Sequence, residues 1–231
     1  MIAAAARYLL FERLLPHAPR PVRRAVRTRH LRRRRPRLEL VNRYLRDLEG
    51  IEIGRAAYHD FGLNALNVDL HPVPDSAYVR EQLRLAGRVS PVDVVAPGDA
   101  LPFEDGSVDF VFASHVIEHF PDPIRALYEW VRVARRYVFL IVPHRERTFD
   151  RDRELTTVDE LIERHASGFT SSEDRHWSVW TCESFLELCE RIGLRVIDHR
   201  DPDAAVGNGF EVVIDAESSR RLLRAIARRP E

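Results

Sequence analysis

The stretch that decides the fold runs from residue 98 to residue 119 and reads GDALPFEDGSVDFVFASHVIEH. Its centre, residues 109–113, is a short apolar run with aromatic and β-branched side chains, which predicts a buried β-strand. Titratable side chains follow directly, because His115, Glu118 and His119 lie just beyond this strand. The stretch therefore connects a predicted core strand to residues that are able to carry chemistry.

Similar short runs recur on both sides of this stretch. The predicted strands cover residues 51–54, 65–70, 92–95, 109–113, 137–142, 194–198 and 211–214. Helical patterns with recognisable starts lie between them: Asp122 and Pro123 suit the cap and first position of a helix to about residue 135, and Thr157 with Glu160 predicts a capping box. Strands that alternate with helices indicate an α/β fold with a mostly parallel sheet.

The first two predicted strands end in a layout that is typical of nucleotide sites. Residues 51–54 end on Gly54, and residues 65–70 contain Asp69 near their end. In an open parallel sheet, ligands bind beyond the carboxyl ends of the strands. There a glycine lets the backbone approach the ligand, and an acidic residue at the second strand end can bind the ribose hydroxyls. The sequence has no Gly-x-Gly-x-x-Gly motif, which would form the glycine-rich turn that binds the pyrophosphate of a dinucleotide. A nicotinamide oxidoreductase is therefore only a weak alternative, supported by Asp69 alone.

The stretch from residue 98 to residue 119 closely resembles the class I S-adenosylmethionine-dependent methyltransferases. Members of this family carry an Asp-Ala pair, a Leu-Pro-Phe and Ser-x-Asp approach to the fourth strand, and a His-x-x-Glu-His run after it. The resemblance covers roughly residues 51–214. It implies a Rossmann-like fold with a mostly parallel seven-stranded sheet and flanking helices, S-adenosylmethionine as the cofactor, and methyl transfer to a small-molecule or glycan-precursor acceptor.

The resemblance also implies roles for individual residues. Glu52, Ile53 and Gly54 match the motif that contacts the methionine part of the cofactor. Asp69, with Leu70 beside it, matches the acid that binds the ribose hydroxyls. Asp99 and Ala100 match the adenine contacts, and Ser114 and His115 match the strand end that faces the sulfonium and the acceptor.

Two positions depart from the family pattern. Arg55 stands where a small residue is common, and residues 134–136 replace a Pro-Gly-Gly turn. If Arg55 and Tyr58 fill the methionine pocket, the chain is instead a non-catalytic binding module that keeps the fold.

The histidines beyond the strands are the candidates for handling the acceptor. We expect His115, His119 and His144 to position it, with Glu118 orienting them, residues 150–153 lining the entrance and no metal ion taking part. Two alternatives for the His-x-x-Glu-His run stay open: a zinc hydrolase using His115, Glu118 and His119, and purely local hydrogen bonding. His144 suits acceptor contact or loop capping equally well.

The residues between the fifth strand and the last predicted helix also have two interpretations each. Residues 145–153 either clamp an anionic acceptor through arginines or form ion pairs with Asp150 and Asp152. His176, Trp177 and Trp180 form either an aromatic wall for the acceptor or part of the core, and we favour the core for Trp180.

Composition narrows the possible chemistry. All 36 basic residues among the 231 are arginines, so Schiff-base enzymes, P-loop nucleotide triphosphatases and Tyr-x-x-x-Lys dehydrogenases are excluded, since each needs a lysine. The two cysteines, Cys182 and Cys189, lie on one apolar helical stripe closed by Gly193, which predicts a core position and fits a reducing compartment.

Charge divides the chain into two predicted parts. Residues 1–46 carry 14 arginines against Glu12 and Glu39, a formal charge of +12, and residues 47–231 carry −12. We expect a basic helical arm before a methyltransferase-like domain. The arm is either solvated on the acidic body or binds an anionic partner, namely a membrane surface, a polyanionic glycan or a nucleic acid.

No apolar window approaches the roughly 20 residues that span a bilayer, and no apolar stretch follows the arginine pairs as an export signal requires. We therefore expect a cytoplasmic protein, either free or peripheral at the membrane surface.

Overall fold

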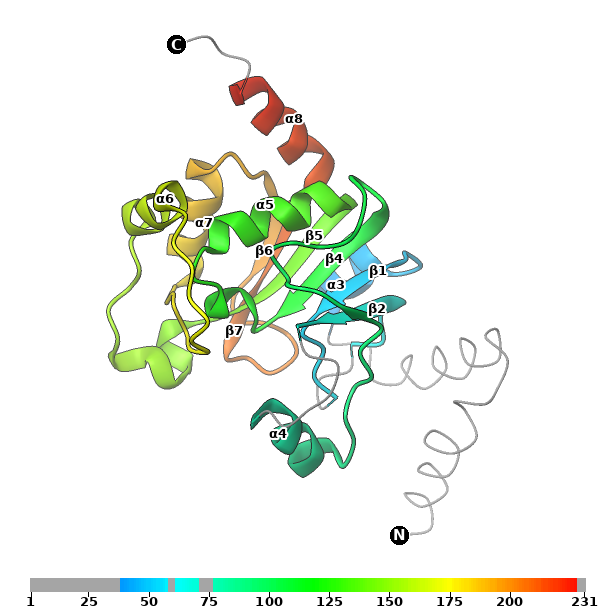
Figure 1. Cartoon of the computed structure of the whole chain (residues 1–231). Helices are drawn as coiled ribbons and strands as arrows, with labels where there is room; N and C mark the ends of the chain where they lie inside the picture. The colour runs from blue at the N-terminus through cyan, green and yellow to red at the C-terminus, as the bar shows by residue number, and fades with distance from the viewer. Residues whose placement is uncertain (1–37, 58–60, 71–76, 228–231) are drawn as a thin grey trace. The chain divides into compact units, whose positions relative to one another are not determined.

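The computed structural model describes residues 38–57, 61–70 and 77–227. The predicted arm up to residue 37, and Tyr58, lie outside this range. The described residues form helices on either side of a central sheet (Figure 1). The helices are α3 (Glu39–Leu45), α4 (Ala77–Ala86), η4 (Ile117–His119), α5 (Pro123–Val133), η5 (Arg145–Arg147), η6 (Phe149–Asp152), α6 (Val158–Ser167), α7 (Cys182–Arg191) and α8 (Ala216–Ala227).

The sheet has seven strands in the order β3-β2-β1-β4-β5-β7-β6. They are β1 (Gly50–Ile53), β2 (Ala65–Asp69), β3 (Val94–Val95), β4 (Val108–Ser114), β5 (Ala134–Pro143), β6 (Val196–Arg200) and β7 (Gly209–Asp215). The first five run parallel, and β7 is antiparallel to both β5 and β6. This is the Rossmann-like α/β fold expected from the sequence, and all seven predicted strands are present.

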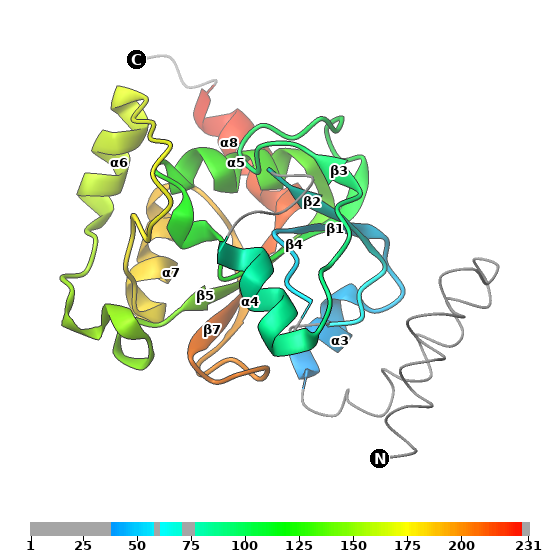
Figure 2. The ribbon, with the colours of Figure 1, turned by 60° about the horizontal axis from the view of Figure 1, so that its bottom comes forward.

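The two faces of the sheet are covered by different helices, because neighbouring strand residues point to opposite sides. One face carries Ile51, Val111 and Leu140 and forms one buried core with residues of α5 and α7. The other face is aromatic: the ring of Tyr137 contacts Tyr44 of α3, and Phe112 lies against Phe139. Figure 2 shows α3 and α5 on opposite sides of β1 and β4.

The parallel strands all end at one edge of the sheet, which we call the carboxyl edge. Its strand ends are followed by Gly54 after β1, by Ala96 after β3, by His115 after β4 and by His144 after β5, and Asp69 ends β2. Ligands of open parallel sheets bind at such an edge. The fold thus brings together candidate residues from distant parts of the sequence.

Helix ends differ from the sequence expectations in two places. The helix that begins after Asp122 stops at Val133 rather than near residue 135, because Ala134 is extended and already pairs with Val108 of β4. Thr157 accepts the N–H of Glu160, but the carboxylate of Glu160 pairs with Arg164 and does not complete the capping box. A complete capping box is found instead at the start of α7, between Thr181 and Ser184.

Other expectations about the body are confirmed. Cys182 and Cys189 are buried and unpaired on one face of α7, and Trp180 is also buried in the core. Among the described helices, none combines the length and hydropathy needed to cross a bilayer. Residues 40–45 of α3, which fall within the predicted arm, bury Leu40, Val41 and Leu45.

Candidate functional site at the carboxyl edge

The turn after β1 has the backbone that close approach of a ligand requires. Gly54 is left-handed, with φ of 64°, and a Cβ added to it would lie 3.1 Å from Cγ2 of Val116. A side chain at this position would therefore fill the space between the ends of β1 and β4. Ile53, which also belongs to the predicted motif, is buried in the core and anchors the residue before the turn.

Arg55 points away from the carboxyl edge. Its Nε donates to the buried Glu52 carboxylate at 2.6 Å, and its Nη2 donates to the carbonyl of Ala65 at the start of β2 at 2.8 Å. The backbone N–H of Arg55 is held by the Asn67 side chain at 3.1 Å. The bulky side chain is thus folded back along the sheet, and Glu52 serves as its counter-ion.

Asp69, the last residue of β2, lies on the strand next to β1. Asp69 is partly exposed, and its carbonyl accepts the N–H of Ala96, which fixes the loop after β3 beside it. Leu70, the next residue, is 55% exposed. Asp69 is therefore an accessible carboxylate at the edge, next to the turn of Gly54.

The loop after β3 meets α5 in a shallow hollow of about 580 Å³. Asp99 and Ala100 line it together with Arg125, Tyr128 and His165. Asp99 lies 3.5 Å from the Arg125 guanidinium, and the Trp130 indole donates to the carbonyl of Gly98 at 2.7 Å. These contacts anchor the loop whose residues were expected to contact adenine.

β4 ends in a strained turn. Ser114 is the last strand residue and is half-buried, and His115 adopts a left-handed backbone with φ of 54°, which is unusual for a residue with a side chain. Such strain concentrates at functional sites. After it, Ile117–His119 form a single 3-10 turn, so His115 and His119 do not share the face of an α-helix as the zinc-hydrolase motif requires.

A buried carboxylate lies at the centre of this region. Glu118 is fully buried, and among the described residues neither of its oxygens has a hydrogen-bond partner. Three imidazole nitrogens surround its Oε1: Nδ1 of His115 at 3.9 Å, Nε2 of His119 at 4.0 Å and Nε2 of His176 at 3.9 Å. Burial raises the pKa of Glu118 to about 8, and Asp150 adds to the effect.

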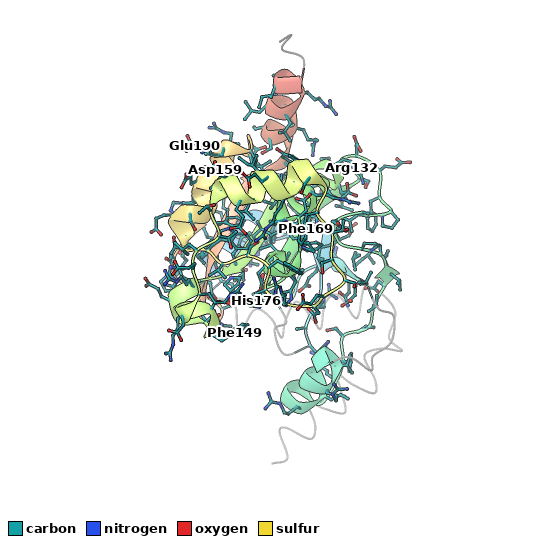
Figure 3. All side chains as sticks on the ribbon, turned by 60° about the vertical axis from the view of Figure 1, so that its left-hand side comes forward. Arg132, Phe149, Asp159, Phe169, His176 and Glu190 are labelled. Atoms are coloured by element: carbon teal, nitrogen blue, oxygen red, sulfur yellow. The ribbon has the colours of Figure 1, made fainter. Side chains whose placement is uncertain are left out.

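Two more carboxylates hold the histidines. Nδ1 of His119 lies 3.0 Å from Asp174, and Nδ1 of His176 lies 2.5 Å from the buried Asp150. The two rings meet edge to face at 4.8 Å, and Phe149 covers His176 at 4.5 Å. Figure 3 shows Phe149 and His176 next to each other at this end of the molecule. Burial lowers the pKa of His119, as does the neighbouring His176.

The sequence identified only part of this group. His115, Glu118 and His119 were expected, whereas His176 was expected either in an aromatic wall for the acceptor or in the core, and Asp174 was not considered. His176 arrives from a loop that the backbone ties to the 3-10 turn, since the N–H of Trp177 donates to the carbonyl of Glu118 at 2.7 Å. No spacing rule connects residues so far apart in the chain.

His144 lies among other partners. It is buried, its Nδ1 accepts the N–H of Glu146 at 3.2 Å, and its ring meets Phe210 edge to face. These are the contacts of the loop-capping alternative, and acceptor contact by His144 stays a prediction. In the loop that follows, Arg153 pairs with Asp150 at 2.6 Å and Arg151 with Asp152 at 3.7 Å, as the ion-pair alternative expects.

Comparison with known proteins assigns the domain. Residues 50–142 match the family model described as a methyltransferase domain. Over these residues, the chain is similar to the methyltransferase domains of S-adenosylmethionine-dependent enzymes. It is 40% identical over 80 residues to an uncharacterized methyltransferase of Mycobacterium sp. (strain JLS), and 39% identical over 80 residues to one of Mycolicibacterium gilvum (strain PYR-GCK). These matches cover 35% of this chain and 29% and 30% of those relatives.

Solved methyltransferases align with this chain at low sequence identity. A protein from Methanosarcina mazei aligns with a TM-score of 0.48 and 18% identity, covering 76% of this chain and 96% of that one. One from Aquifex aeolicus aligns with a TM-score of 0.47 and 16% identity, covering 78% and 89%.

S-adenosylmethionine is the cofactor that the methyltransferase domain implies, and the residues at the carboxyl edge fit it. The cofactor has no phosphate, so the single left-handed Gly54 suffices where a dinucleotide would need a glycine-rich cradle. Accessible carboxylates such as Asp69 suit a ligand with ribose hydroxyls and a positively charged sulfur.

Proposed function

We propose that this chain transfers a methyl group from S-adenosylmethionine to a nucleophile on a small molecule or glycan precursor. The observation that carries the proposal is the carboxyl edge itself. It places a left-handed glycine, an accessible aspartate and a strained histidine at the ends of three neighbouring strands, β1, β2 and β4.

In this proposal each strand end has its own task toward the cofactor. The Asp69 carboxylate accepts hydrogen bonds from the ribose hydroxyls, and the turn at Gly54 admits the methionine part beside Val116. Asp99 and Ala100 contact the adenine from the loop that Trp130 anchors. When bound, S-adenosylmethionine supplies an electrophilic methyl carbon on a sulfonium.

The acceptor side begins at His115. Catalysis of methyl transfer comes mainly from holding the nucleophile in line with the methyl carbon, so groups that position the acceptor matter more than a strong base. His115 lies directly after Ser114 at the strand end, with its backbone fixed by a hydrogen bond to Ile141 at 2.9 Å. His119 and Glu118 lie next to His115, since a ring nitrogen of each histidine is about 4 Å from Glu118 Oε1.

The orientation of Arg55 also bears on the proposal. The non-catalytic alternative relied on Arg55 and Tyr58 occupying the methionine pocket. Because the Arg55 guanidinium is paired with Glu52 and with the carbonyl of Ala65, it is held away from the turn at Gly54, which supports cofactor binding. Tyr58 is outside the described residues.

Calorimetric titration with S-adenosylmethionine and S-adenosylhomocysteine tests the proposal. We expect micromolar binding of both by the full chain and its loss in Asp69→Ala, because the ribose contact disappears. Asp159→Ala is the matched control, since this exposed aspartate of α6 pairs with Arg191 and lies outside the site. Absence of binding by the unmodified chain, or equal binding by Asp69→Ala, would contradict the proposal.

A further inference from the structure

The group formed by Glu118, His119 and His176 has a use beyond positioning an acceptor. One donor atom from each of the three residues lies within 4.8 Å of the others. The two Nε2 atoms are 4.0 and 3.9 Å from Glu118 Oε1, which is too far for hydrogen bonds. Donor atoms of a tetrahedral zinc site lie about 3.3–3.6 Å apart, because bonds from zinc to imidazole or carboxylate are about 2.0–2.2 Å long, so donors about 4 Å apart are close to this spacing.

We propose that Glu118, His119 and His176 bind a divalent transition-metal ion through Oε1 and the two Nε2 atoms. The expectation that this site uses no metal is replaced by this proposal. The donor atoms, which lie within 4.8 Å of one another, need to approach by up to roughly 1.3 Å to reach tetrahedral spacing, which side-chain rotation can supply.

The orientation of both imidazole rings supports the proposal. In protein metal sites, a histidine ligand typically donates its other ring N–H to a carboxylate, which fixes both its tautomer and its direction. Here Nδ1 of His119 meets Asp174 at 3.0 Å, and Nδ1 of His176 meets Asp150 at 2.5 Å. In the tautomer in which each Nδ1 donates to its carboxylate, each Nε2 keeps its lone pair, and the two Nε2 atoms lie 4.0 and 3.9 Å from Glu118 Oε1. Two independent carboxylate–imidazole pairs thus converge on one point.

The state of Glu118 is the second argument. An ionised carboxylate without hydrogen bonds is costly to bury, so it must either keep a proton or meet a cation. Glu118 is fully buried, and both of its oxygens lack hydrogen-bond partners within the described part of the chain. A bound cation would supply the partner that this buried carboxylate lacks among the described residues.

The donor set indicates which ions fit. Two imidazole nitrogens and one carboxylate oxygen suit zinc and its transition-metal neighbours, whereas calcium and magnesium prefer oxygen ligands alone. Three protein ligands leave at least one coordination position open, as in catalytic zinc sites. Nδ1 of His115 is 3.9 Å from the same Glu118 oxygen, so the proposed metal site lies beside the residue that begins the acceptor side.

This position defines an acceptor class, and here the inference rests on the proposed function. A hydroxyl oxygen that occupies the open position has a lowered pKa and loses its proton to solvent. That oxygen then bonds to the methyl carbon while the bond from carbon to sulfur breaks, and S-adenosylhomocysteine leaves. The acceptor is therefore a hydroxyl compound that can coordinate a divalent ion, and His119 acts as a metal ligand rather than as a base.

Metal titration of the full chain tests the site. The protein is stripped with chelator and titrated with Zn²⁺ by calorimetry and with Co²⁺ by visible absorption. We expect one equivalent of each ion, with the intense Co²⁺ bands of a four- or five-coordinate site. Glu118→Gln and His176→Ala should each weaken binding at least 100-fold. Asp174→Asn should weaken it about 10–100-fold, because it removes only the carboxylate behind His119.

A matched histidine variant controls for the ten histidines of the chain. His165 also pairs with an aspartate, Asp122, through Nδ1 at 2.9 Å, but it is not part of the group, so His165→Ala should bind metal normally. Thermal melting confirms that Glu118→Gln is folded, and we expect it to be, since a neutral amide replaces a protonated acid. No stoichiometric binding, or binding that survives Glu118→Gln and His176→Ala, would overturn the proposal.

Titration of the same metal-free protein with S-adenosylhomocysteine separates the two proposals. Metal binding without nucleoside binding would remove the proposed function and leave the metal site. Nucleoside binding without metal binding would remove only the metal site.

Discussion

Two residues with left-handed backbones, Gly54 and His115, follow neighbouring strands at the carboxyl edge. Gly54 has no Cβ, so its conformation carries no steric penalty, whereas His115 retains its side chain despite that penalty. Strain in a residue with a side chain persists only where the surroundings enforce it. At the carboxyl edge, Gly54 therefore adds no side chain after β1, whereas the backbone of His115 fixes the direction of its imidazole after β4.

Replacing Gly54 by alanine should damage binding as well as stability. We expect Gly54→Ala to lower the free energy of unfolding by about 1–2 kcal/mol, the usual cost of a left-handed residue with a Cβ. It should also weaken S-adenosylhomocysteine binding at least tenfold, because the new methyl group meets Val116 at 3.1 Å in the turn that admits the ligand. Urea denaturation and calorimetry measure the two effects.

Gly87→Ala is the matched control for this prediction. Gly87 is also left-handed, with φ of 67°, but a Cβ there meets nothing within 4 Å. It should lose similar stability and keep full affinity. If the two variants bind equally well, Gly54 does not face the ligand.

At the same scale, sequence reasoning found the residues near the strand ends and missed their partners. His115, Glu118 and His119 were identified because they follow a predicted strand and resemble a family motif. His176 and Asp174 reach them through the loop before α7, held by the hydrogen bond between Trp177 and Glu118. Only tertiary structure reveals such a contact, because it depends on how a long irregular segment folds back.

At the scale of elements, the sequence predicted strands and caps from local chemistry. Asp122 caps α5 as expected, because its carboxylate accepts the N–H of Arg125 at 3.0 Å. The His-x-x-Glu-His run was more ambiguous, and the structure gives it one 3-10 turn instead of an α-helix. Residues 134–136, which stand where the family has a Pro-Gly-Gly turn, form no turn here. The chain passes directly from α5 into β5, because Ala134 is the first residue of the strand.

The loop between β6 and β7 makes a testable prediction about acid stability. The buried carboxylate of Asp203 accepts four backbone N–H groups, from Ala205, Val206, Gly207 and Gly209, at 2.7–2.9 Å. Burial raises its pKa, but these four donors outweigh burial, and the net pKa is lowered from 3.8. A lowered pKa means that the group stabilises the fold at every pH above 3.8 and loses this contribution as the pH falls through the folded value.

Asp203→Asn should therefore lower the free energy of unfolding at neutral pH by about 1–3 kcal/mol, because its amide leaves buried donors without acceptors. It should also flatten the loss of stability below pH 3.8. Denaturant unfolding at a series of pH values measures both. Asp152→Asn is the control, since that side chain is 91% exposed. Parallel pH profiles for Asp203→Asn and the unmodified chain would contradict the prediction.

At the scale of the whole molecule, the chain combines a basic N-terminal segment with an acidic body, and truncation separates their roles. Residues 1–37 contain 12 arginines against Glu12. If the arm binds an anionic partner, deleting them should lower retention on an anionic matrix in a salt-dependent way and leave cofactor affinity unchanged. Unchanged retention would contradict the anionic partner.

A longer truncation should behave differently. Deleting residues 1–46 also removes α3, whose Tyr44 contacts Tyr137 and donates a hydrogen bond to Asp198 at 2.9 Å. We expect this truncation to be destabilised, because Leu40, Val41 and Leu45 leave the core. Thermal melting of the two truncations compares them, and equal melting temperatures would show that α3 adds nothing to the body.

The most direct test of the central claim is hydrogen–deuterium exchange of the full chain with and without S-adenosylhomocysteine. If the carboxyl edge is the cofactor site, protection should appear in peptides that cover residues 50–57, 65–70, 96–101 and 113–119, while β6 and α8 stay unchanged. These segments are separate in the sequence, and the strand ends that they contain meet at that edge. Binding without protection of these segments, or protection confined to another part of the body, would contradict the account.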